Sequence, residues 1–371
     1  MPDTAGSDKR VPTSLRGIAK MARCNTQHRF RDLYGLLNSE MLQLAWKGLN
    51  KSSAIADDDI TVKEYSQDLS ANLEGLAERL RQKRYRAKLV KRRFIPKRNG
   101  KKRPLGTPAL MDKLVQKAVA MSLTEIYEPD FLDCSYGYRP GKGARDAIGD
   151  LTFQLQFGVF GYVVEADIKS YFDTINHDKL MAILEKRIND RAFLRLIWKW
   201  LKAGILHPDG QIEHPVTGTP QGGLVSPVLS NIYLHEVLNK WFQDVVEPKL
   251  AGRAIMCRYA DDWVCAFQYR DDADRFYSVL SKRLGGFGLE VEPSKTKIIR
   301  FSRFQYFYVR GNALAVWAFY RDMISSAFKW LNRRSQRKSY NWEHFKRILE
   351  YVGIPKPKLT EKKRFRTCAL N

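Results

Sequence analysis

Two short apolar segments, far apart in the sequence, carry acidic residues at one end, and they restrict the possible folds more than any other feature. Residues 162–168 are typical of a buried strand, and acidic Asp167 lies at the end of this segment. Residues 255–267 form two apolar arms around Asp261 and Asp262, a pattern that predicts a β-hairpin with carboxylates at its tight turn. If the strand lies beside the hairpin, folding brings three carboxylates together.

Aspartate is also common in ordinary turns, where its side chain bonds neighbouring backbone amides. Carboxylates this close to apolar arms are costly unless they are paired or bind a metal, so a metal site is the favoured interpretation. Magnesium prefers hard oxygen donors, and two or three Asp side chains plus substrate phosphates suffice to hold it. Phosphoryl transfer to a 3′-hydroxyl uses two such cations. The aspartates therefore predict a magnesium-dependent polymerase.

Basic residues predominate, because 64 Lys and Arg stand against 40 Asp and Glu and give a formal net charge of +24. This balance favours a polyanionic partner, with nucleic acid preferred to a membrane surface. Residues 81–103 include thirteen basic residues and no acidic one, with a hairpin-turn signal at Asn99–Gly100. If this segment were only a solvated surface, its like charges would repel one another, so a phosphate-binding β-ribbon is the favoured interpretation.

The sequence also bears on the cellular compartment. The five cysteines are scattered and include no C-x-x-C pair, which indicates neither a disulfide framework nor a zinc site. No stretch of eighteen apolar residues occurs, and the first thirty residues hold no continuous apolar run. We therefore expect a soluble, cytoplasmic protein with no membrane partner.

Several motifs appear in a fixed order along the chain. They are RPLGTP at 103–108, SYGYRPG at 135–141, DIKSYFD at 167–173, GTPQGGLVSP at 218–227 with NIYL at 231–234, and YADD at 259–262. Over residues 30 to 355 or so, this order resembles the reverse transcriptases encoded by bacterial group II introns, which also act as maturases in intron splicing. A lone YADD would be weak support, but the ordered set leaves little room for chance.

The resemblance implies a role for individual residues. Asp167, Asp261 and Asp262 would be catalytic, and these three with Ile168 would hold two Mg²⁺ ions, which Mn²⁺ can replace. The positions that match nucleotide-binding residues of the family are Lys97, Arg103, Phe172, Gln221 and Lys295. The first two would grip the triphosphate, and Phe172 would exclude a 2′-hydroxyl, so the substrates would be deoxynucleotides. The plainer alternatives are generic basic surface for the cations, a core position for Phe172 and a simple turn at Gln221.

The same resemblance implies an α+β right-hand polymerase fold, with fingers and palm and a shortened α-helical thumb or maturase region. The expected segments are a flexible basic lead-in (1–25), an N-terminal helical extension (26–80), fingers (81–155), a palm with inserted finger helices (156–300), a truncated thumb/maturase-like region (301–355) and a basic tail (356–371). After Arg300 the expected strand motif and first thumb helices are missing, which indicates an internal deletion between palm and thumb.

The function that follows is RNA-directed DNA synthesis on an RNA template and a DNA primer, from dNTPs, with group II intron RNA as a further partner. One alternative is a splicing cofactor that binds its intron but polymerises weakly or not at all, because the primer-holding segment is missing. A second alternative is an unstable remnant whose deletion exposes the palm core. The sequence leaves the oligomeric state open.

Overall fold

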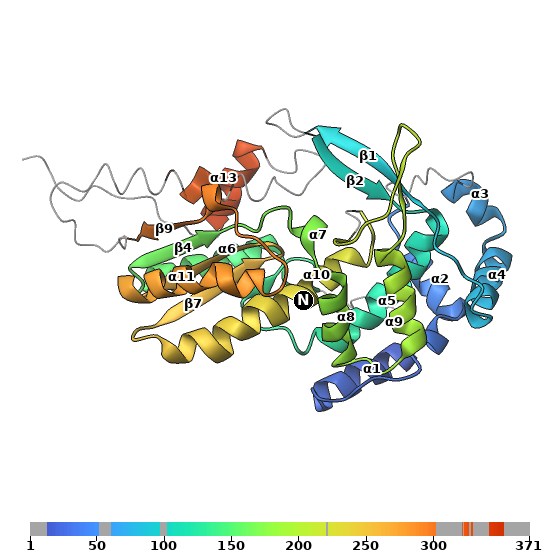
Figure 1. Cartoon of the computed structure of the whole chain (residues 1–371), viewed down its shortest axis with the longest axis horizontal. Helices are drawn as coiled ribbons and strands as arrows, with labels where there is room; N and C mark the ends of the chain where they lie inside the picture. The colour runs from blue at the N-terminus through green and yellow to red at the C-terminus, as the bar shows by residue number, and fades with distance from the viewer. Residues whose placement is uncertain are drawn as a thin grey trace, which may run out of the picture.

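The computed structural model describes residues 13–51, 61–96, 102–219, 222–301 and 341–351, and positions 321, 323–325 and 328. Within these residues, helices pack beside two small sheets, in the α+β arrangement that the sequence predicts (Figure 1). No helix in this part of the chain has the length and apolar character needed to cross a bilayer.

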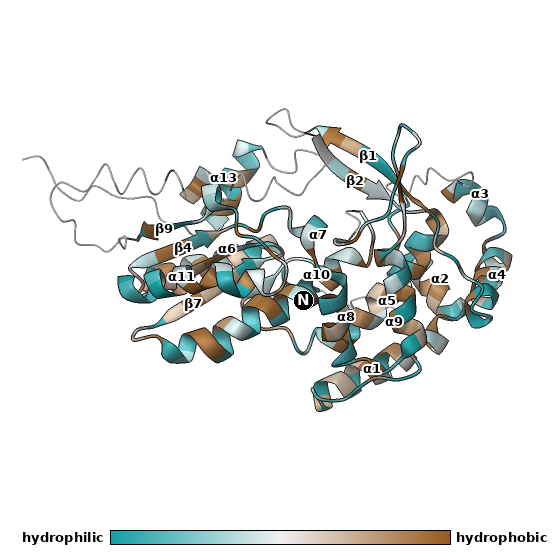
Figure 2. Ribbon diagram, in the orientation of Figure 1, coloured by the Kyte–Doolittle hydropathy of each residue, from teal (hydrophilic) through white to brown (hydrophobic). Residues whose placement is uncertain are grey.

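A helical lobe forms around one central helix, α5 (Leu110–Tyr127). This helix is buried on almost every side, as its apolar composition requires. Outer helices of the molecule, such as α11, are instead amphipathic, with teal and brown residues on different faces (Figure 2). The remaining helical elements of the lobe are α1 (Thr13–Cys24), η1 (Tyr34–Leu36), α2 (Ser39–Lys47), α3 (Val62–Gln67), α4 (Leu69–Arg81), α8 (His177–Glu185) and α9 (Arg191–Leu201).

The basic segment forms the expected β-ribbon beside this lobe (Figure 1). Strands β1 (Val90–Pro96) and β2 (Lys102–Thr107) pair antiparallel, and the predicted turn at Asn99–Gly100 lies outside the described residues. Two short strands, β5 (Ile205–Leu206) and β6 (Ile212–Glu213), extend the sheet to the order β2-β1-β5-β6.

The second sheet carries the acidic segments, in the order β3-β7-β8-β4-β9. Its strands are β3 (Ser135–Tyr136), β4 (Tyr162–Ala166), β7 (Ala254–Tyr259), β8 (Asp262–Phe267) and β9 (Lys297–Arg300). Helix α11 (Arg270–Gly285) packs on one face, against the rings of Trp263 and Phe267. Helix α6 (Ala144–Phe157) packs on the other, against Cys257 and Val264.

The remaining elements connect these parts. They are α7 (Tyr171–Thr174), α10 (Ser226–Leu234), the π-helical turns η2 (His235–Asn239) and η3 (Phe242–Val246), η4 (Glu247–Lys249), η5 (Pro293–Lys295) and α13 (Trp342–Tyr351). One continuous apolar core runs from α1 through α5 and α10 to the second sheet. A smaller cluster joins α13 to the N-terminal part of α6.

Three expectations about elements need correction. Residues 13–24 form α1, whose Leu15, Ile18 and Ala22 are buried and which packs on α5, so a flexible lead-in over 1–25 is wrong for this part. The helix expected from Thr61 to Leu80 is two helices that meet at Asp68. The helical pattern over 177–206 ends in strand β5. The deletion after Arg300 falls on residues 302–320, which lie outside the described residues.

Candidate active site at the aspartate-bearing hairpin

The hairpin β7–β8 presents two aspartates at its turn. Tyr259 pairs with Asp262, so the loop consists of Ala260 and Asp261. Ala260 has a φ of +55°, the positive value that two-residue hairpin turns require at their first position. Glycine is usual there, and Ala260 adopts this conformation while fully buried. The turn therefore holds a strained residue immediately before the aspartates.

Strand β4 brings the third aspartate to the same place. Ala166 pairs with Trp263, and continuing this antiparallel register by one pair sets Asp167 opposite Asp262. Directly opposite residues share a face of a sheet, so these two carboxylates project to the same side. In the described structure the strand end therefore lies beside the hairpin turn, as predicted.

The Asp167 carboxylate has a cationic neighbour. The Lys295 ammonium donates to Asp167 Oδ2, and the Lys295 side chain is about half exposed at 52%. Lys295 ends η5, and the segment just before it is bonded to β4, because the Glu292 N–H donates to the Asp167 carbonyl over 2.8 Å. The structure thus brings Lys295 to Asp167, while its predicted role in binding the nucleotide stays a prediction.

Ile168 follows Asp167 and faces Val291 in an isolated antiparallel bridge. The hydrogen bonds on either side run from Glu292 N–H to the Asp167 carbonyl and from Lys169 N–H to the Glu290 carbonyl. Ile168 and Val291 are therefore a non-hydrogen-bonded pair, in which the main-chain N–H and C=O point away from the partner segment. The Ile168 carbonyl consequently points toward the β8 side of the sheet.

Phe172 lies in α7, just past this strand, and is buried with 8% of its surface exposed. Its ring meets that of Tyr171 edge-on, and the Tyr171 hydroxyl donates to the Ser230 carbonyl over 2.9 Å. Burial raises the pKa of Tyr171 above its ordinary value, so this donor stays protonated. Phe172 therefore lies in the main apolar core, a few residues past Asp167.

The loop that carries Gln221 is anchored on both sides of that residue, although residues 220 and 221 themselves lie outside the described residues. The Thr219 N–H donates to the Phe172 carbonyl over 2.7 Å. After Gln221, Gly222 has a φ of +116°, and a Cβ there would come within 2.2 Å of the Gly106 carbonyl oxygen. The Leu224 N–H donates to Gln116 Oε1 over 2.9 Å. The segment thus joins α7 to β2 and α5.

His177 holds the same loop through a contact with the Gly218 carbonyl. Its Nε2 lies 2.6 Å from the Gly218 carbonyl, and its ring meets Trp198 edge-on. Burial lowers the pKa of His177, so the neutral ring with a proton on Nε2 is the form that donates to this carbonyl. The other two predicted nucleotide ligands are less defined: Arg103 lies on β2 without a described side chain, and Lys97 lies outside the described residues.

The donor set has the chemistry of a site for hard divalent cations. Asp167, Asp261, Asp262 and the Ile168 carbonyl offer oxygen atoms only, which suits magnesium or manganese better than softer metals. Within the described parts of the chain, no three His, Cys, Asp or Glu side chains are gathered closely enough to hold a metal by themselves. The chemistry of these donors fits such a metal, for which substrate phosphates and water would have to supply further ligands.

Comparison with known proteins identifies the family. Residues 95–345, more than half of the chain, match the model described as reverse transcriptase (RNA-dependent DNA polymerase). The chain belongs to this family. Among curated relatives, it is 39% identical over 230 residues to the group II intron-encoded protein LtrA of Lactococcus lactis subsp. cremoris, covering 60% of this chain and 37% of that protein.

Two further relatives extend this group. The chain is 42% identical over 192 residues to protein YkfC of Escherichia coli (strain K12), covering 50% of this chain and 48% of that protein. It is 36% identical over 212 residues to an uncharacterized 91 kDa protein in the cob intron of Schizosaccharomyces pombe, covering 56% and 26% respectively. The chain spans less than half the length of each of these three relatives, two of which are named for introns.

Arg258, which lies two residues before the turn, was not predicted from the sequence. Its side chain is fully buried, and its guanidinium donates to the Ala260 carbonyl over 2.7 Å. A charged residue inside the apolar arm 255–259 was the signal that could have found it, because an arginine is almost never fully buried without specific partners. Among so many basic residues that signal did not stand out.

Proposed function

We propose that this chain is an RNA-directed DNA polymerase that transfers deoxynucleotides to a primer 3′-hydroxyl on an RNA template. The observation that carries the proposal is the register of β4 and β8, which sets Asp167 opposite Asp262 beside the turn that holds Asp261. Family membership supports the reaction class. Group II intron RNA is the natural further partner, since LtrA is named as an intron-encoded protein.

In this proposal, the aspartates and the Ile168 carbonyl hold two Mg²⁺ ions, and Mn²⁺ can replace them. Such ions, when bound, favour ionisation of the 3′-hydroxyl and neutralise charge on the leaving pyrophosphate. The sheet supplies the positioning, because the aspartates lie on strand ends and not on a long loop. Lys295, already in contact with Asp167, orients that carboxylate and approaches the nucleotide phosphates.

The nucleotide side of the site would be built around Phe172 and Gln221. The loop around Gln221 contacts α7 through Thr219 and β2 through Gly222, and β2 also carries Arg103. Phe172 would contact the sugar and exclude a 2′-hydroxyl, while Arg103 and Lys97 would bind the triphosphate as a bidentate fork and a point charge.

The test is primer extension on poly(rA)/oligo(dT) with Mg²⁺ by the purified chain and its Asp261→Asn, Asp262→Asn variant. We expect extension by the wild type and a loss of at least about 10³-fold in the variant, since electrostatic stabilisation of this kind is a large part of the rate enhancement. Asp244→Asn, at an exposed position on η3, is the matched control and should extend normally. A folded wild type that does not extend would overturn the proposal.

A second candidate is a splicing cofactor with weak or no polymerase activity, favoured by relatives such as nuclear intron maturase 4 of Arabidopsis thaliana, at 24% identity over 149 residues. The two candidates differ in their dependence on the turn. Intron splicing assisted equally by the wild type and by the Asp261→Asn, Asp262→Asn variant, without any extension, would favour the cofactor.

A further inference from the structure

We propose that Arg258 is a positioning residue for the catalytic aspartates, acting through the main chain of the turn as the centre of a buried latch with Ser135, Asn231 and Asn239. The proposal rests on the proposed polymerase function for its kinetic consequences. Its structural part concerns only how the turn is held, and it can be tested without catalysis.

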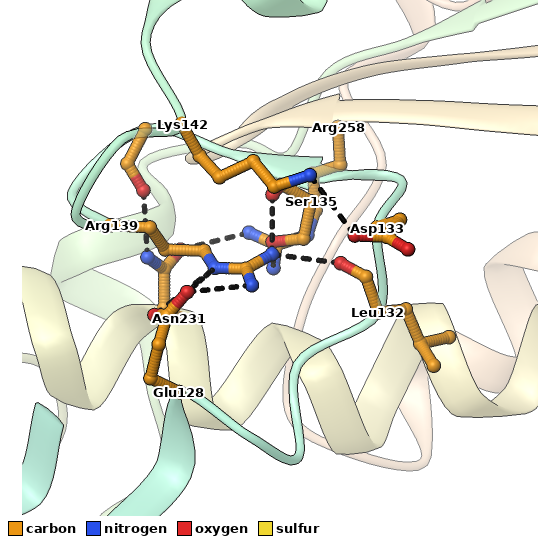
Figure 3. A network of polar contacts seen from close by, with 9 residues as sticks. Glu128, Leu132, Asp133, Ser135, Arg139, Lys142, Asn231 and Arg258 are labelled. Carbon is orange, nitrogen blue, oxygen red and sulfur yellow. Dashed lines mark hydrogen bonds and ion pairs between the residues drawn. The ribbon is translucent and has the colours of Figure 1, made fainter. Parts of the chain in front are cut away.

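The guanidinium of Arg258 connects four elements. Nε donates to Asn239 Oδ1 over 2.8 Å, and Nη2 donates to the Ser135 hydroxyl. Nη1 donates to Asn231 Oδ1 over 3.0 Å and to the Ala260 carbonyl over 2.7 Å. These partners lie on η2, β3, α10 and the hairpin turn, so one side chain ties the turn to the elements around it. Figure 3 shows Arg258 with two of them, Ser135 and Asn231.

The carboxamide of Asn231 has only one orientation that suits both of its neighbours. Its oxygen faces the Arg258 donor, and its Nδ2 donates to the Gly137 carbonyl over 2.8 Å. A flipped amide would set N–H against N–H and oxygen against oxygen. Because Asn231 and Arg258 are both buried, that mismatch would leave polar groups unsatisfied away from water.

The peptide units around Ala260 are held on two sides. The Ala260 N–H donates to the Tyr136 carbonyl over 2.8 Å, while the Ala260 carbonyl accepts from Arg258. The positive φ of Ala260 is unfavourable for a residue with a Cβ, so it persists only where surrounding bonds compensate for it. Releasing the carbonyl removes one of these bonds and frees the turn that carries Asp261 and Asp262.

A second arginine supports the latch from the side of β3. Arg139 donates to the Leu132 and Ser135 carbonyls over 2.7 and 2.6 Å, and it pairs with Glu128 at 2.8 Å (Figure 3). Ser135 is therefore fixed through its carbonyl by Arg139 and through its hydroxyl by Arg258. The motifs at 135–141, at 218–234 and at the hairpin meet in this one network, which gives the first two a role in shaping the turn.

The planar guanidinium is what the latch requires. It presents donors in three fixed directions to partners on separate elements, whereas a lysine ammonium is a compact group that cannot span them. Arg258→Lys keeps the positive charge but cannot bond all of these partners at once. Its effect therefore reports the geometry of the guanidinium and not its charge. Arg187→Lys is the matched control, because Arg187 is also buried and bonds the Asn25 and His28 carbonyls, far from the turn.

The experiment measures three properties of the full-length wild type, Arg258→Lys, Asn231→Ala and Arg187→Lys. Thermal melting reports overall stability, hydrogen exchange reports opening of the segment 256–263, and electron paramagnetic resonance reports Mn²⁺ binding. We expect similar melting losses in Arg258→Lys and Arg187→Lys. Only the Arg258 and Asn231 variants should exchange faster in 256–263 and bind Mn²⁺ at least about fivefold more weakly.

In primer extension, the Arg258→Lys variant should lose about tenfold to 100-fold in kcat, the effect of a small displacement of reacting groups, with KM for dNTP within about twofold. Faster exchange and weaker Mn²⁺ binding in Arg187→Lys to the same degree, or neither effect in Arg258→Lys, would overturn the proposal. If Arg258→Lys does not fold, the same readouts on Asn231→Ala decide. A wild type that binds Mn²⁺ but does not extend primers would refute the polymerase function and leave the positioning role of Arg258 standing. If the wild type does not bind Mn²⁺, hydrogen exchange at 256–263 alone decides whether Arg258 holds the turn.

Discussion

Single residues determine the shape of the aspartate site because two of its turns use backbone conformations that few side chains tolerate. Ala260 has a positive φ at the hairpin, and Gly222 has one beside Gln221. In both cases the neighbouring main chain is close: the Tyr136 carbonyl bonds Ala260, and the Gly106 carbonyl lies against Gly222. Substitutions here act through the backbone before they act on any substrate.

Gly222→Ala tests this point at the loop. A Cβ would meet the Gly106 carbonyl at 2.2 Å, in a φ region that alanine avoids. We expect the free energy of unfolding in urea to fall by about 1–3 kcal/mol, with a higher KM for dNTP. Gly75→Ala, in an open position on helix α4, is the control and should raise the unfolding free energy by roughly 0.5–1 kcal/mol. Equal effects of the two changes would contradict this account.

Lys295 offers a second test, because its ammonium and a metal ion compete for the same Asp167 oxygen. Removing the charge with Lys295→Gln should lower the Mn²⁺ concentration needed for half-saturation by about two- to fivefold, the worth of an exposed ion pair. The same change should raise the KM for dNTP. Lys297→Gln, which removes a pair with Glu165 on the neighbouring strand, should leave Mn²⁺ binding unchanged.

The burial of His235 should make the free energy of unfolding depend on pH. Burial lowers the pKa of His235 to about 4 in the folded chain, whereas an unfolded histidine titrates near 6.5. Between these values the unfolded chain binds more protons, so stability present above pH 6.5 is lost as the pH falls toward 4. The loss should reach about 3 kcal/mol at most. Urea unfolding from pH 7 to 5 should show a smaller decline for His235→Gln than for the wild type or His344→Gln, whose ring is exposed.

At this scale the sequence predicted the three aspartates at a strand end and a tight turn, and the structure confirms their placement. It failed at Arg258, because a basic residue in a basic chain carries no distinct signal until its burial is known. It also could not show that Asn231 and Ser135 meet this guanidinium, since such contacts depend on the packing of segments far apart in the sequence.

Single elements are held in place by caps as well as by their apolar faces. Asp190 caps α9, where its Oδ1 accepts from the N–H groups of Ala192 and Phe193 at 2.9 and 3.0 Å. Its Oδ2 accepts from the Tyr34 N–H over 2.8 Å, so the same carboxylate also binds η1 to this helix. One side chain thus orders two elements.

Asp190→Ala should therefore cost more than an ordinary cap. We expect a loss of about 1–3 kcal/mol in unfolding free energy, the sum of a lost N-cap and an N–H without its acceptor. Asp178→Ala, an exposed acid in the first turn of α8 that does not cap it, is the comparison and should change stability by less than about 0.5 kcal/mol. A cost of the same size at both sites would show that the cap contributes nothing.

Elements with strong periodicity or composition could be predicted, and those fixed by distant contacts could not. The helix over 111–127 and the hairpin over 255–267 lie where the sequence indicates. Over residues 13–24 the helical spacing of Leu15, Ile18 and Ala22 was a usable signal, but the Gly, Ser and basic residues mixed among them obscured it. The break at Asp68 was hidden, since the apolar positions on either side continue the same spacing.

At the scale of the whole molecule, the net charge of +24 governs encounters with nucleic acid. If about six phosphates are contacted, RNA affinity should fall by about 10³-fold between 50 and 200 mM salt. Lys91→Gln, Arg93→Gln on the β1–β2 ribbon should reduce the slope of log K against log salt by about 1.5, whereas Lys240→Gln, Lys249→Gln should leave it unchanged. Filter binding at several salt concentrations measures both slopes, and identical slopes would remove the ribbon from the interface.

The α+β class and the right-hand polymerase family were accessible from ordered motifs, whereas the order of the strands was not. Strand β3 runs parallel to β7, and β9 pairs with β4 from the far side. Neither pairing could be predicted from a local turn in the sequence, because each joins segments separated by several helices. The domain boundaries drawn from the sequence remain predictions.

The central place of β4 has a consequence for how the protein is made. Both of its neighbours, β8 and β9, come much later in the chain. During translation, both edges of β4 therefore stay unpaired until those strands have been synthesised. Exposed strand edges recruit other chains, and non-local pairing is slow. Yield in a cell is therefore set by how well this one strand is shielded during translation, and slower growth at low temperature or added chaperones should improve recovery more than any change to the finished surface.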